Sequence, residues 1–486
     1  MSRRPTLFDM SADGKRCVRF PESDVPHIGA DEALGADQVR QTSPALPQVS
    51  EAEIARHYAA LARMNYDLDF GFYPLGSCTM KYNPKAIQQA AALPGWTGLH
   101  PATPASCAQG ALQIMWLLEQ MLAQIAGLPA VSLQPPAGAA GEFTCLRVFR
   151  AYHDSRGDHA RTAVIVPDTA HGTNPASVAR CGYSSRPLQS GPDGRINLEA
   201  LQDALDDGTA AVMLTNPNTL GLFETDIVAI AEAVHDAGAL LYCDGANMNA
   251  MLGYGRPGDM GFDAMHYNLH KTFGTPHGGG GPGSGPIAVT AALEPFLPVP
   301  RISREGNRFE WDWDRPQSIG LVHGFYGNFL VAIQAYAYIL SLGAEGLREA
   351  SRAAVLNANY LLQGLADAYE LAYPGPCMHE CVFSAQELQR ETGVRAADLA
   401  KRLLDYDIHP PTMYFPLVVK EALMIEPTET ESKATLDRFI EVMLTLHEEA
   451  HTDPQVLQSA PHKTPVGRLD ELQAARKPVL RWQPEQ

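Results

Sequence analysis

The 486-residue sequence has no run of apolar residues that approaches the 18 or so needed to span a bilayer. Its basic N-terminus is followed by Ser, Ala, Asp and Gly instead of the apolar stretch of an export signal. The eight cysteines include no CxxC pair, which disfavours a disulfide framework. We therefore expect a cytoplasmic protein with reduced thiols and no membrane role.

Positive charge is also scarce in this chain. Lys and Arg number 37 against 55 Asp and Glu, which gives a formal net charge of −18 at pH 7. Duplex binding depends on cationic side chains that neutralise phosphates, so nucleic acid is not expected as a partner. An anionic cofactor would need a local site built from backbone amides.

Sequence patterns of several familiar enzyme classes are missing. No GxGxxG sequence follows directly on an expected strand, which argues against a nicotinamide site. No GxSxG sequence marks a serine nucleophile. The cysteines do not cluster with the 16 histidines, so we expect no bound metal ion.

The chain is long enough for two or three structural units, at roughly 100–200 residues per domain. A Ser-Glu-Ala-Glu capping box at Ser50 predicts a first helix over 51–63, and the Pro- and Gly-rich residues before it predict an extended arm. The expected parts are an arm with the first helix (1–60), a large α/β domain (61–325), connecting helices (326–372), and a small α+β C-terminal domain with a tail (373–486).

Short apolar runs alternate with amphipathic stretches between about 138 and 290. This alternation predicts an α/β fold with a mostly parallel sheet wrapped by helices. The expected strands are 163–166, 211–214, 239–243, 264–267 and 286–289. The expected crossover helices lie near 141–155, 174–181, 197–207 and 226–237. Two long helices, about 325–342 and 345–369, should lead to the small domain.

Polar residues follow several of the expected strands. Ligands of an open parallel sheet bind outside the carboxyl ends of its strands, so these side chains are candidates for one site. The candidates are Asp244, Thr215, Asn216, His171, His270 and Lys271.

Lys271 and Asp244 have the chemistry of a pyridoxal phosphate (PLP) site. Such a site needs a lysine for the aldehyde and a carboxylate that faces the pyridine nitrogen. The carboxylate keeps that nitrogen protonated, which lets the ring delocalise a carbanion. His171 could lie flat on the ring and share in proton transfer.

Each of these residues alone has a plainer explanation. A lone Asp at a strand end is usually a turn former or a helix cap, and a lone Lys in a loop is usually a solvated charge. His171 could be a turn histidine. Lys271, however, lies between an apolar strand and the glycine-rich stretch 278–285, which is a poor context for an ordinary surface lysine.

The segment PPAGAAGEF at 135–143 places small residues directly before an expected helix. Backbone amides of Ala139, Ala140 and Gly141 could face a phosphate there, assisted by the helix dipole. An ordinary glycine-containing helix start explains the segment equally well. The glycine-rich residues 278–285 could be a flexible linker, but their position favours close approach of backbone to a ligand or a neighbouring subunit.

Several longer motifs occur in one order along the chain. They are LGSCTMKYNP, AGAAGE, AHGTNPAS, TNPNTLGLFE, DGANMNA, NLHKTFGTPHGGGGPGSGP and PPTMYFPLVVKEALMIEPTETESK. Together they make the chain resemble the P-protein of the glycine cleavage system, and within that family the subunit 2 of the two-subunit bacterial type. The resemblance runs from about residue 60 to about residue 450.

This resemblance implies a fold-type I PLP-dependent transferase with glycine decarboxylase (decarboxylating glycine dehydrogenase) activity. Such an enzyme releases CO2 from glycine and passes the aminomethyl group to the lipoyl arm of the H-protein. By motif, Lys271 would hold the cofactor as a Schiff base, Asp244 would pair with the pyridinium, and His171 would stack on the ring. Ala139 to Gly141 would receive the phosphate. The family commonly has a larger polar or imidazole side chain at the position of Ala140, so binding there would rely on backbone amides.

The resemblance also implies further residues and partners. The other cofactor-binding residues would be Ala246, His270, Thr275, Thr215 and Asn216, with Thr272 nearby. Ser77, Cys78 and Thr79 would border the glycine site, where Cys78 is either a reactive thiol or a buried, inert one. The partners would be a P-protein subunit 1, in two copies of each subunit, and the lipoylated H-protein.

Two other functions are compatible with the same residues. One is a different fold-type I enzyme, an aminotransferase or an amino-acid decarboxylase, which would turn over without a carrier. The other is a non-catalytic assembly subunit, which the presence of both Lys271 and Asp244 disfavours.

Overall fold

The computed structural model describes residues 4–278 and 283–481, and the chain divides into two units, Met1–Asp67 and Leu68–Gln486. Residues 279–282, for which a close backbone approach was expected, lie outside the described residues. Each unit is described by itself.

The first unit is an arm with two helices, α1 (Ala30–Leu34) and α2 (Glu51–Ala62). The predicted capping box is present at the start of α2: the Ser50 hydroxyl accepts from the Glu53 amide, and the Glu53 carboxylate accepts from the Ser50 amide. Each of these bonds satisfies an amide that the helix leaves without a partner. The helix expected at this position is therefore confirmed.

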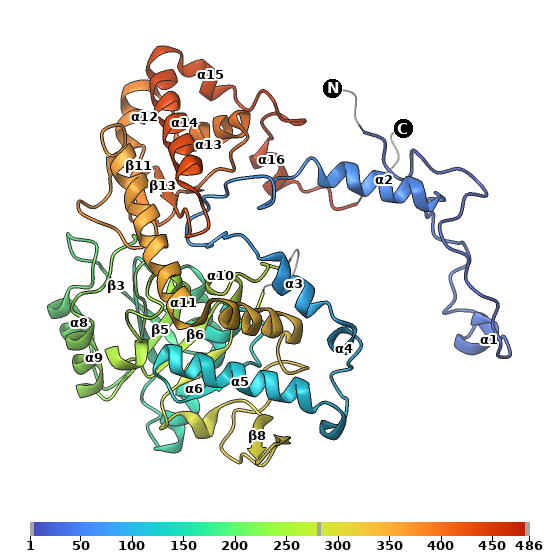
Figure 1. Cartoon of the computed structure of the whole chain (residues 1–486), viewed down its shortest axis with the longest axis horizontal. Coiled ribbons are helices and arrows are strands. Elements are labelled where there is room, and N and C mark those ends of the chain that lie inside the picture. Colours follow the sequence, from blue (N-terminus) through green and yellow to red (C-terminus); the bar gives the residue numbers. More distant parts are fainter. Residues whose placement is uncertain (1–3, 279–282, 482–486) are drawn as a thin grey trace. The chain divides into compact units, whose positions relative to one another are not determined.

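A seven-stranded sheet forms the centre of the second unit (Figure 1). Its strands are β1 (Ala130–Ser132), β2 (Ala163–Pro167), β3 (Ser184–Leu188), β4 (Thr209–Thr215), β5 (Leu240–Gly245), β6 (Ala264–Tyr267) and β7 (Ile287–Val289). They lie in the order β1-β7-β6-β5-β4-β2-β3. The five strands from β6 to β3 are parallel, and β7 is antiparallel to both β6 and β1. The expected mostly parallel sheet is confirmed.

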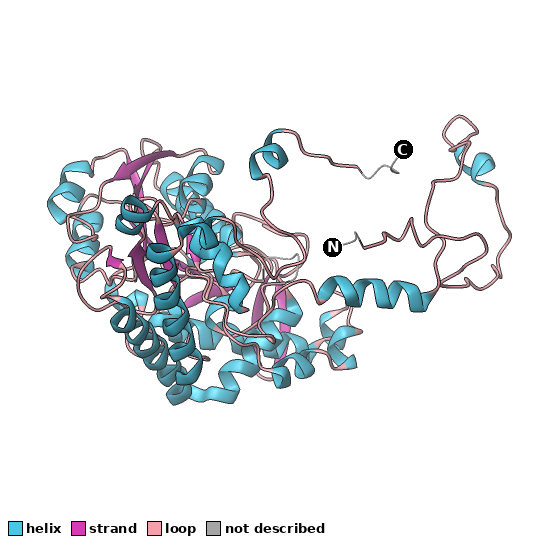
Figure 2. Ribbon diagram, turned by 90° about the horizontal axis from the view of Figure 1, so that it is seen from above, coloured by secondary structure: helices cyan, strands magenta, loops and turns pink. Residues whose placement is uncertain are grey.

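Helices cover both faces of this sheet, and the strands lie inside them (Figure 2). They are α5 (Gln109–Ala126), α6 (Gly138–Ser155), α7 (Thr173–Arg180), α8 (Leu198–Ala204) and α9 (Ile227–Asp236). The short helices α3 (Lys85–Ala91) and α4 (Pro94–Thr97) precede α5, and α10 (Leu269–Thr272) follows β6. Successive strand residues face opposite cores, because side chains alternate along a strand. Val212 packs in the core that contains α5 and α9, whereas Met213 packs in the core that contains α6 and α7.

Four strands between residues 130 and 312 were not expected from the sequence. Strand β3 lies at an edge of the sheet, and most of its residues, which include Pro187, are exposed, so it lacks the apolar run of a central strand. Strand β1 has only three residues. The hairpin of β8 (Arg301–Glu305) and β9 (Arg308–Asp312) forms a separate small sheet.

The C-terminal part of the second unit contains an antiparallel four-stranded sheet with helices packed against it (Figure 1). Its strands are β10 (Glu370–Leu371), β11 (Cys381–Ser384), β12 (Thr412–Met413) and β13 (Ala422–Ile425), in the order β10-β11-β13-β12. Its helices are α12 (Gln386–Thr392), α13 (Ala396–Leu403), α14 (Lys433–Thr452) and α15 (Pro454–Gln458). The last helix, α16 (Glu471–Arg476), has no buried residue. Single 3-10 turns occur at Ala105–Cys107, Met248–Ala250, Pro257–Met260, Glu294–Phe296 and Leu404–Tyr406.

One long helical element, α11 (Phe329–Leu365), joins the two sheets. The two helices expected here are continuous except at Gly343, whose φ of 62° is non-helical. By length and composition alone α11 could cross a membrane. It packs against α3, α5 and α14, and its buried residues belong to both cores, as Ala335 and Leu361 illustrate. This packing is that of a core helix.

Candidate active site

Three neighbouring strands bring polar side chains to one level at their carboxyl ends. In the parallel register Thr215 of β4 pairs with Asp244 of β5, and Asp244 pairs with His266 of β6. Asp244 is buried, with its Oδ1 atom 3.6 Å from Nε2 of His266. The sheet itself therefore sets the spacing of these three groups.

Two hydrogen bonds orient the Asp244 carboxylate. Nδ2 of Asn174 donates to Oδ2 at 2.9 Å, and the amide of Ala246 donates to Oδ1 at 3.0 Å. Burial works against the charge, yet the pKa of Asp244 lies below its ordinary value because the His266 ring, the Asn174 amide and the charge of Lys271 face it. The carboxyl group is thus held ready in its ionised form.

Lys271 lies in the short helix α10, directly after β6. His270 beside it is buried, and its ring meets that of His277 edge to face with centroids 5.0 Å apart. Burial, and then the neighbouring His277, lower the pKa of His270 to about 3. The histidine next to the lysine is therefore neutral near pH 7.

The first turn of α6 points backbone amides at the same region. The first amides of a helix have no partner within it, which leaves those of Gly138, Ala139 and Ala140 available. The amide of Gly141 donates to the Ala137 carbonyl at 2.9 Å, and its expected contribution to a phosphate site stays a prediction. The amides without a partner in the helix therefore begin at Gly138, one residue before the predicted Ala139, because the Gly141 amide already bonds within the helix.

Two glycines in this region have no room for a side chain. A Cβ on Gly138 would lie 2.2 Å from Nδ2 of Asn268, and one on Gly285 would lie 2.0 Å from the Ala137 carbonyl oxygen. The start of α6 therefore packs against the backbone of the segment before β7 and against the Asn268 side chain, which follows β6.

These elements enclose a cavity of about 330 Å³. Of the predicted site residues, it is lined by Ser77, Ala139, His171, Thr215, Asp244, Ala246, His270 and Lys271. The other predicted residues, Cys78, Thr79, Ala140, Gly141, Asn216 and Thr275, lie outside its lining. His171 is exposed, and its ring faces Phe415 at a centroid distance of 5.6 Å. The predicted lysine, carboxylate and histidine thus border one space.

The residues outside the lining have other contacts. The Asn216 side-chain oxygen accepts from the Glu224 amide at 3.1 Å. The Thr275 hydroxyl is buried and has no hydrogen-bond partner among the described residues. Thr79 donates its amide to Glu426, and the carbonyl of Cys78 accepts from Nε2 of His277 at 2.8 Å. Burial raises the pKa of the Cys78 thiol, which favours the unreactive protonated form.

Glu142 is a buried carboxyl group that the sequence analysis did not single out. It accepts hydrogen bonds from the hydroxyls of Thr173 (2.7 Å) and Ser177 (2.8 Å) on α7. Burial, and then the nearby charge of Asp244, raise its pKa to about 7. The i, i+4 spacing of Thr173 and Ser177 on an expected helix was a signal that could have indicated such a partner.

One sequence pattern that is typical of zinc sites is present, although no metal ion was expected. Residues 447–451 read HEEAH, an HExxH pattern on α14. In the structure Nδ1 of His451 bonds the His447 carbonyl, and Nε2 lies 3.1 Å from Glu391, so His451 makes helix-surface contacts. The absence of a metal ion stays a prediction.

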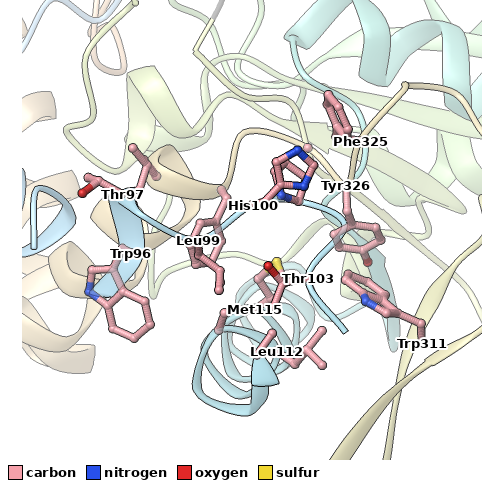
Figure 3. Close-up of a pocket in the computed structure, with 16 residues that line it drawn as sticks. Trp96, Thr97, Leu99, His100, Thr103, Leu112, Met115, Trp311, Phe325 and Tyr326 are labelled. Carbon is pink, nitrogen blue, oxygen red and sulfur yellow. The ribbon is translucent and has the colours of Figure 1, made fainter. Parts of the chain in front are cut away.

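A second cavity, of about 270 Å³, lies between α4, α5 and the segment before α11 (Figure 3). Trp96, Trp311 and Tyr326 give it a largely apolar lining. Its lining includes no lysine and none of the residues predicted for the site.

Family profiles match most of the chain. The profile described as Glycine cleavage system P-protein matches residues 29–302, and the one described as Glycine dehydrogenase, C-terminal domain, matches 350–462. The chain is 55% identical over 480 residues to the probable glycine dehydrogenase (decarboxylating) subunit 2 of Oceanobacillus iheyensis, covering 99% of both chains. The chain belongs to the glycine cleavage system P-protein family. The relative with the same description in Desulforamulus reducens is 54% identical, again over 99% of both chains.

Solved structures agree with this P-protein family assignment in fold. A glycine decarboxylase (P-protein) in inhibitor-bound form superimposes with a TM-score of 0.69 at 23% identity, covering 86% of this chain and 93% of that chain. The sphingosine-1-phosphate lyase of Burkholderia pseudomallei gives a TM-score of 0.63 at 15% identity, with coverage of 86% and 94%. The predicted fold type I is therefore confirmed.

Proposed function

We propose that this chain decarboxylates glycine with PLP and transfers the remaining aminomethyl group to the lipoyl arm of an H-protein. The observation that carries the proposal is the convergence of Lys271, Asp244 and the α6 amides on one cavity, in a member of the P-protein family. Its substrate is glycine and its products are CO2 and the loaded carrier.

The residues around the cavity fit PLP. Lys271 would hold the aldehyde and Asp244 would face the ring nitrogen. The amides of Ala139 and Ala140, with that of Gly138, would receive the phosphate. The buried Thr215 hydroxyl lines the same cavity and has no partner among the described residues, so a polar group of the cofactor would satisfy it.

The chain's own residues position and protect the reacting groups. Asp244 would keep a proton on the ring nitrogen, and the Asn174 and Ala246 hydrogen bonds hold the carboxylate for that role. His171 would cover one face of the ring and share in proton transfer at its imidazole. The chemistry that bound PLP supplies is an electron sink for the pair left when the carboxyl group departs as CO2.

The partners follow from the same proposal. A P-protein subunit 1 would join this chain in two copies of each, and the lipoylated H-protein would dock to the assembly. The oxidised lipoyl disulfide takes up the aminomethyl group and is reduced, so no nicotinamide site is needed. We place the enzyme in the cytoplasm, without a nucleic acid or membrane partner.

The domain roles also belong to the proposal. The large domain (61–325) would bind the cofactor, and the helices of 326–372 would connect it to the small domain with its tail (373–486). The arm (1–60) would contact a neighbouring subunit.

The test is exchange of labelled bicarbonate into the carboxyl carbon of glycine, with H-protein, with and without subunit 1. We expect exchange in the wild-type complex and none with Lys271→Ala. Lys433→Ala, which removes an exposed lysine of α14, is the matched control and should exchange normally. Unchanged exchange with Lys271→Ala would overturn the proposal, and rapid glycine turnover without any lipoyl protein would indicate a different fold-type I enzyme.

A further inference from the structure

Two fully buried carboxyl groups, Glu380 and Glu426, lie opposite each other in the C-terminal sheet. Glu380 directly precedes β11 and Glu426 directly follows β13. Cys381 pairs with Ile425 in the antiparallel register, which sets the two glutamates side by side. Among the described residues their ion-pair contacts are with His379, whose Nε2 lies 3.9 Å from Oε1 of Glu380 and 3.8 Å from Oε1 of Glu426. Buried carboxyl groups are rare in proteins, so their contacts need an explanation.

Each of these carboxyl groups accepts a hydrogen bond from a backbone amide of the loop that precedes α3. The Ser77 amide donates to Oε2 of Glu380 at 2.8 Å, and the Thr79 amide donates to Oε2 of Glu426 at 2.8 Å. The loop thus has one carboxyl partner on each side of Cys78.

The loop backbone needs such support, because Ser77 (φ 63°) and Thr79 (φ 50°) both lie in the left-handed region. Each non-glycine residue there costs roughly 1–2 kcal/mol. Gly76 presses against β13 as well, since a Cβ would lie 2.2 Å from Cγ of Met424. The C-terminal sheet therefore imposes the shape of this loop.

The same loop borders the cavity that contains Lys271. Ser77 lines the cavity, and His277, another lining residue, donates to the Cys78 carbonyl at 2.8 Å. Asn247, also in the lining, donates from Nδ2 to the Pro217 carbonyl at 2.9 Å, with Oε1 of Glu380 at 3.5 Å. Glu380 and Glu426 thus do not reach the cavity themselves, but contact the loop that borders it.

We propose that Glu380 and Glu426 are positioning residues, which hold the Ser77–Thr79 backbone in the shape that binds glycine beside Lys271. This inference rests on the proposed function. Neither carboxyl group lines the cavity, so both act through the loop amides. They make the small domain a structural part of the glycine site.

The carboxyl groups need only an acceptor oxygen for this role. Burial, and then the opposing carboxyl group, raise the pKa of Glu380 well above its ordinary value, and burial raises that of Glu426 to about 7. His379 between them has a pKa lowered to about 3 by burial, so the imidazole is neutral and does not offset their charge. Gln, which keeps a carbonyl oxygen without a charge, should therefore replace either glutamate better than Ala.

The experiment compares Glu380→Ala, Glu380→Gln, Glu426→Ala and Glu426→Gln in the PLP-loaded complex with subunit 1. We expect each Ala variant to raise KM for glycine about tenfold or more in bicarbonate exchange, while kcat and the visible cofactor absorbance change little. Each Gln variant should stay within about threefold of wild type. Hydrogen exchange of the peptide containing residues 77–79 should become faster in the Ala variants alone.

The matched control is Asp405→Ala. Asp405 is also buried and accepts two amides, those of His462 and Lys463, at 2.6 and 2.8 Å, but it is not part of the cavity or the loop. It should leave KM for glycine unchanged.

Several outcomes would overturn the inference. They are an unchanged KM in the Ala variants, Gln variants as impaired as Ala variants, or an equal effect of Asp405→Ala. If an Ala variant does not fold, the Asp variant at the same position, which keeps the carboxyl group but loses reach, should raise KM instead. Absence of exchange in the wild-type complex would be a different result, because it overturns the proposed function itself.

Discussion

Lys81 and Glu429 form an ion pair with 2.6 Å between Nζ and Oε1, and the Lys81 side chain has no exposed surface. The ammonium also donates to Oδ1 of Asn249 at 2.6 Å and to the Thr272 carbonyl at 3.0 Å. Three acceptors therefore satisfy all three protons of the buried ammonium. The pair joins the loop before α3 to the segment after β13 and to α10, which contains Lys271.

We predict that Glu429→Ala destabilises the protein, because it leaves the buried Lys81 charge without its counter-ion. Removing one partner of a buried pair costs about 3–5 kcal/mol, whereas the double variant Lys81→Met with Glu429→Leu should recover most of that loss. Chemical unfolding monitored by circular dichroism measures both. Asp437→Ala breaks the exposed pair with Lys433 and should barely move the unfolding midpoint. A double variant as unstable as Glu429→Ala would contradict the prediction.

Asn174→Ala should weaken PLP binding through Asp244. It removes the 2.9 Å donor to Oδ2, and a hydrogen bond to a charged group contributes about 1.5–3 kcal/mol, so we expect the dissociation constant to rise about tenfold or more. Titration of the apoprotein followed by visible absorbance gives the constant. Ser177→Ala on the same helix, which loses a bond to Glu142 instead, should change it far less. Equal effects of the two variants would refute the assignment to Asp244.

Gly138→Ala should disrupt the start of α6. The added methyl group would lie 2.2 Å from Nδ2 of Asn268, which forces a shift that typically costs about 1–3 kcal/mol. We expect a lower thermal midpoint and weaker PLP binding. Gly95→Ala, in α4 with open space around its Cβ position, is the control and should bind PLP normally. Normal cofactor binding by Gly138→Ala would show that the amides at this turn are not needed.

Glu142 should make the stability of the cofactor-free protein fall with rising pH. Its pKa is raised from about 4.5 to about 7, so the folded state holds a proton that the unfolded state loses. The stabilisation is complete below pH 4.5 and lost as the pH rises through 7. Glu142→Gln should therefore gain on the order of 2–3 kcal/mol relative to wild type between pH 5 and pH 8.

Unfolding experiments at these two pH values test this expectation. Glu232→Gln, which changes an exposed carboxyl group on α9, should show no such gain. A constant difference between Glu142→Gln and wild type at both pH values would contradict the prediction.

The central strands could be predicted because each is a buried run of apolar residues. Val164 and Ile165 in β2, or Leu241 in β5, have no exposed surface, and such runs are typical of parallel sheets. Strand β3 has no such run, because it is an edge strand and most of its residues are exposed to solvent. Its pairing with β2 depends on tertiary position, which a local pattern does not record.

The sequence indicated several of the site residues because they lie at or shortly after the carboxyl end of an expected strand. Asp244 and Lys271 have that place, and the sheet brings them to one cavity. Glu380 and Glu426 became neighbours through strand register, which depends on the pairing of β11 with β13. Their roles, like those of the other site residues, remain predictions for the experiments above.

The contacts of the loop before α3 have a consequence for how the protein is made. Its partners Glu380, Glu426 and Glu429 lie 303, 347 and 348 residues further along the chain. The loop leaves the ribosome early in synthesis but cannot bind these partners until the last quarter of the chain has been made, since synthesis runs from the N-terminus. The cavity beside Lys271 is therefore among the last regions to mature, and chains truncated before Glu380 would keep the lysine while lacking the partners of this loop.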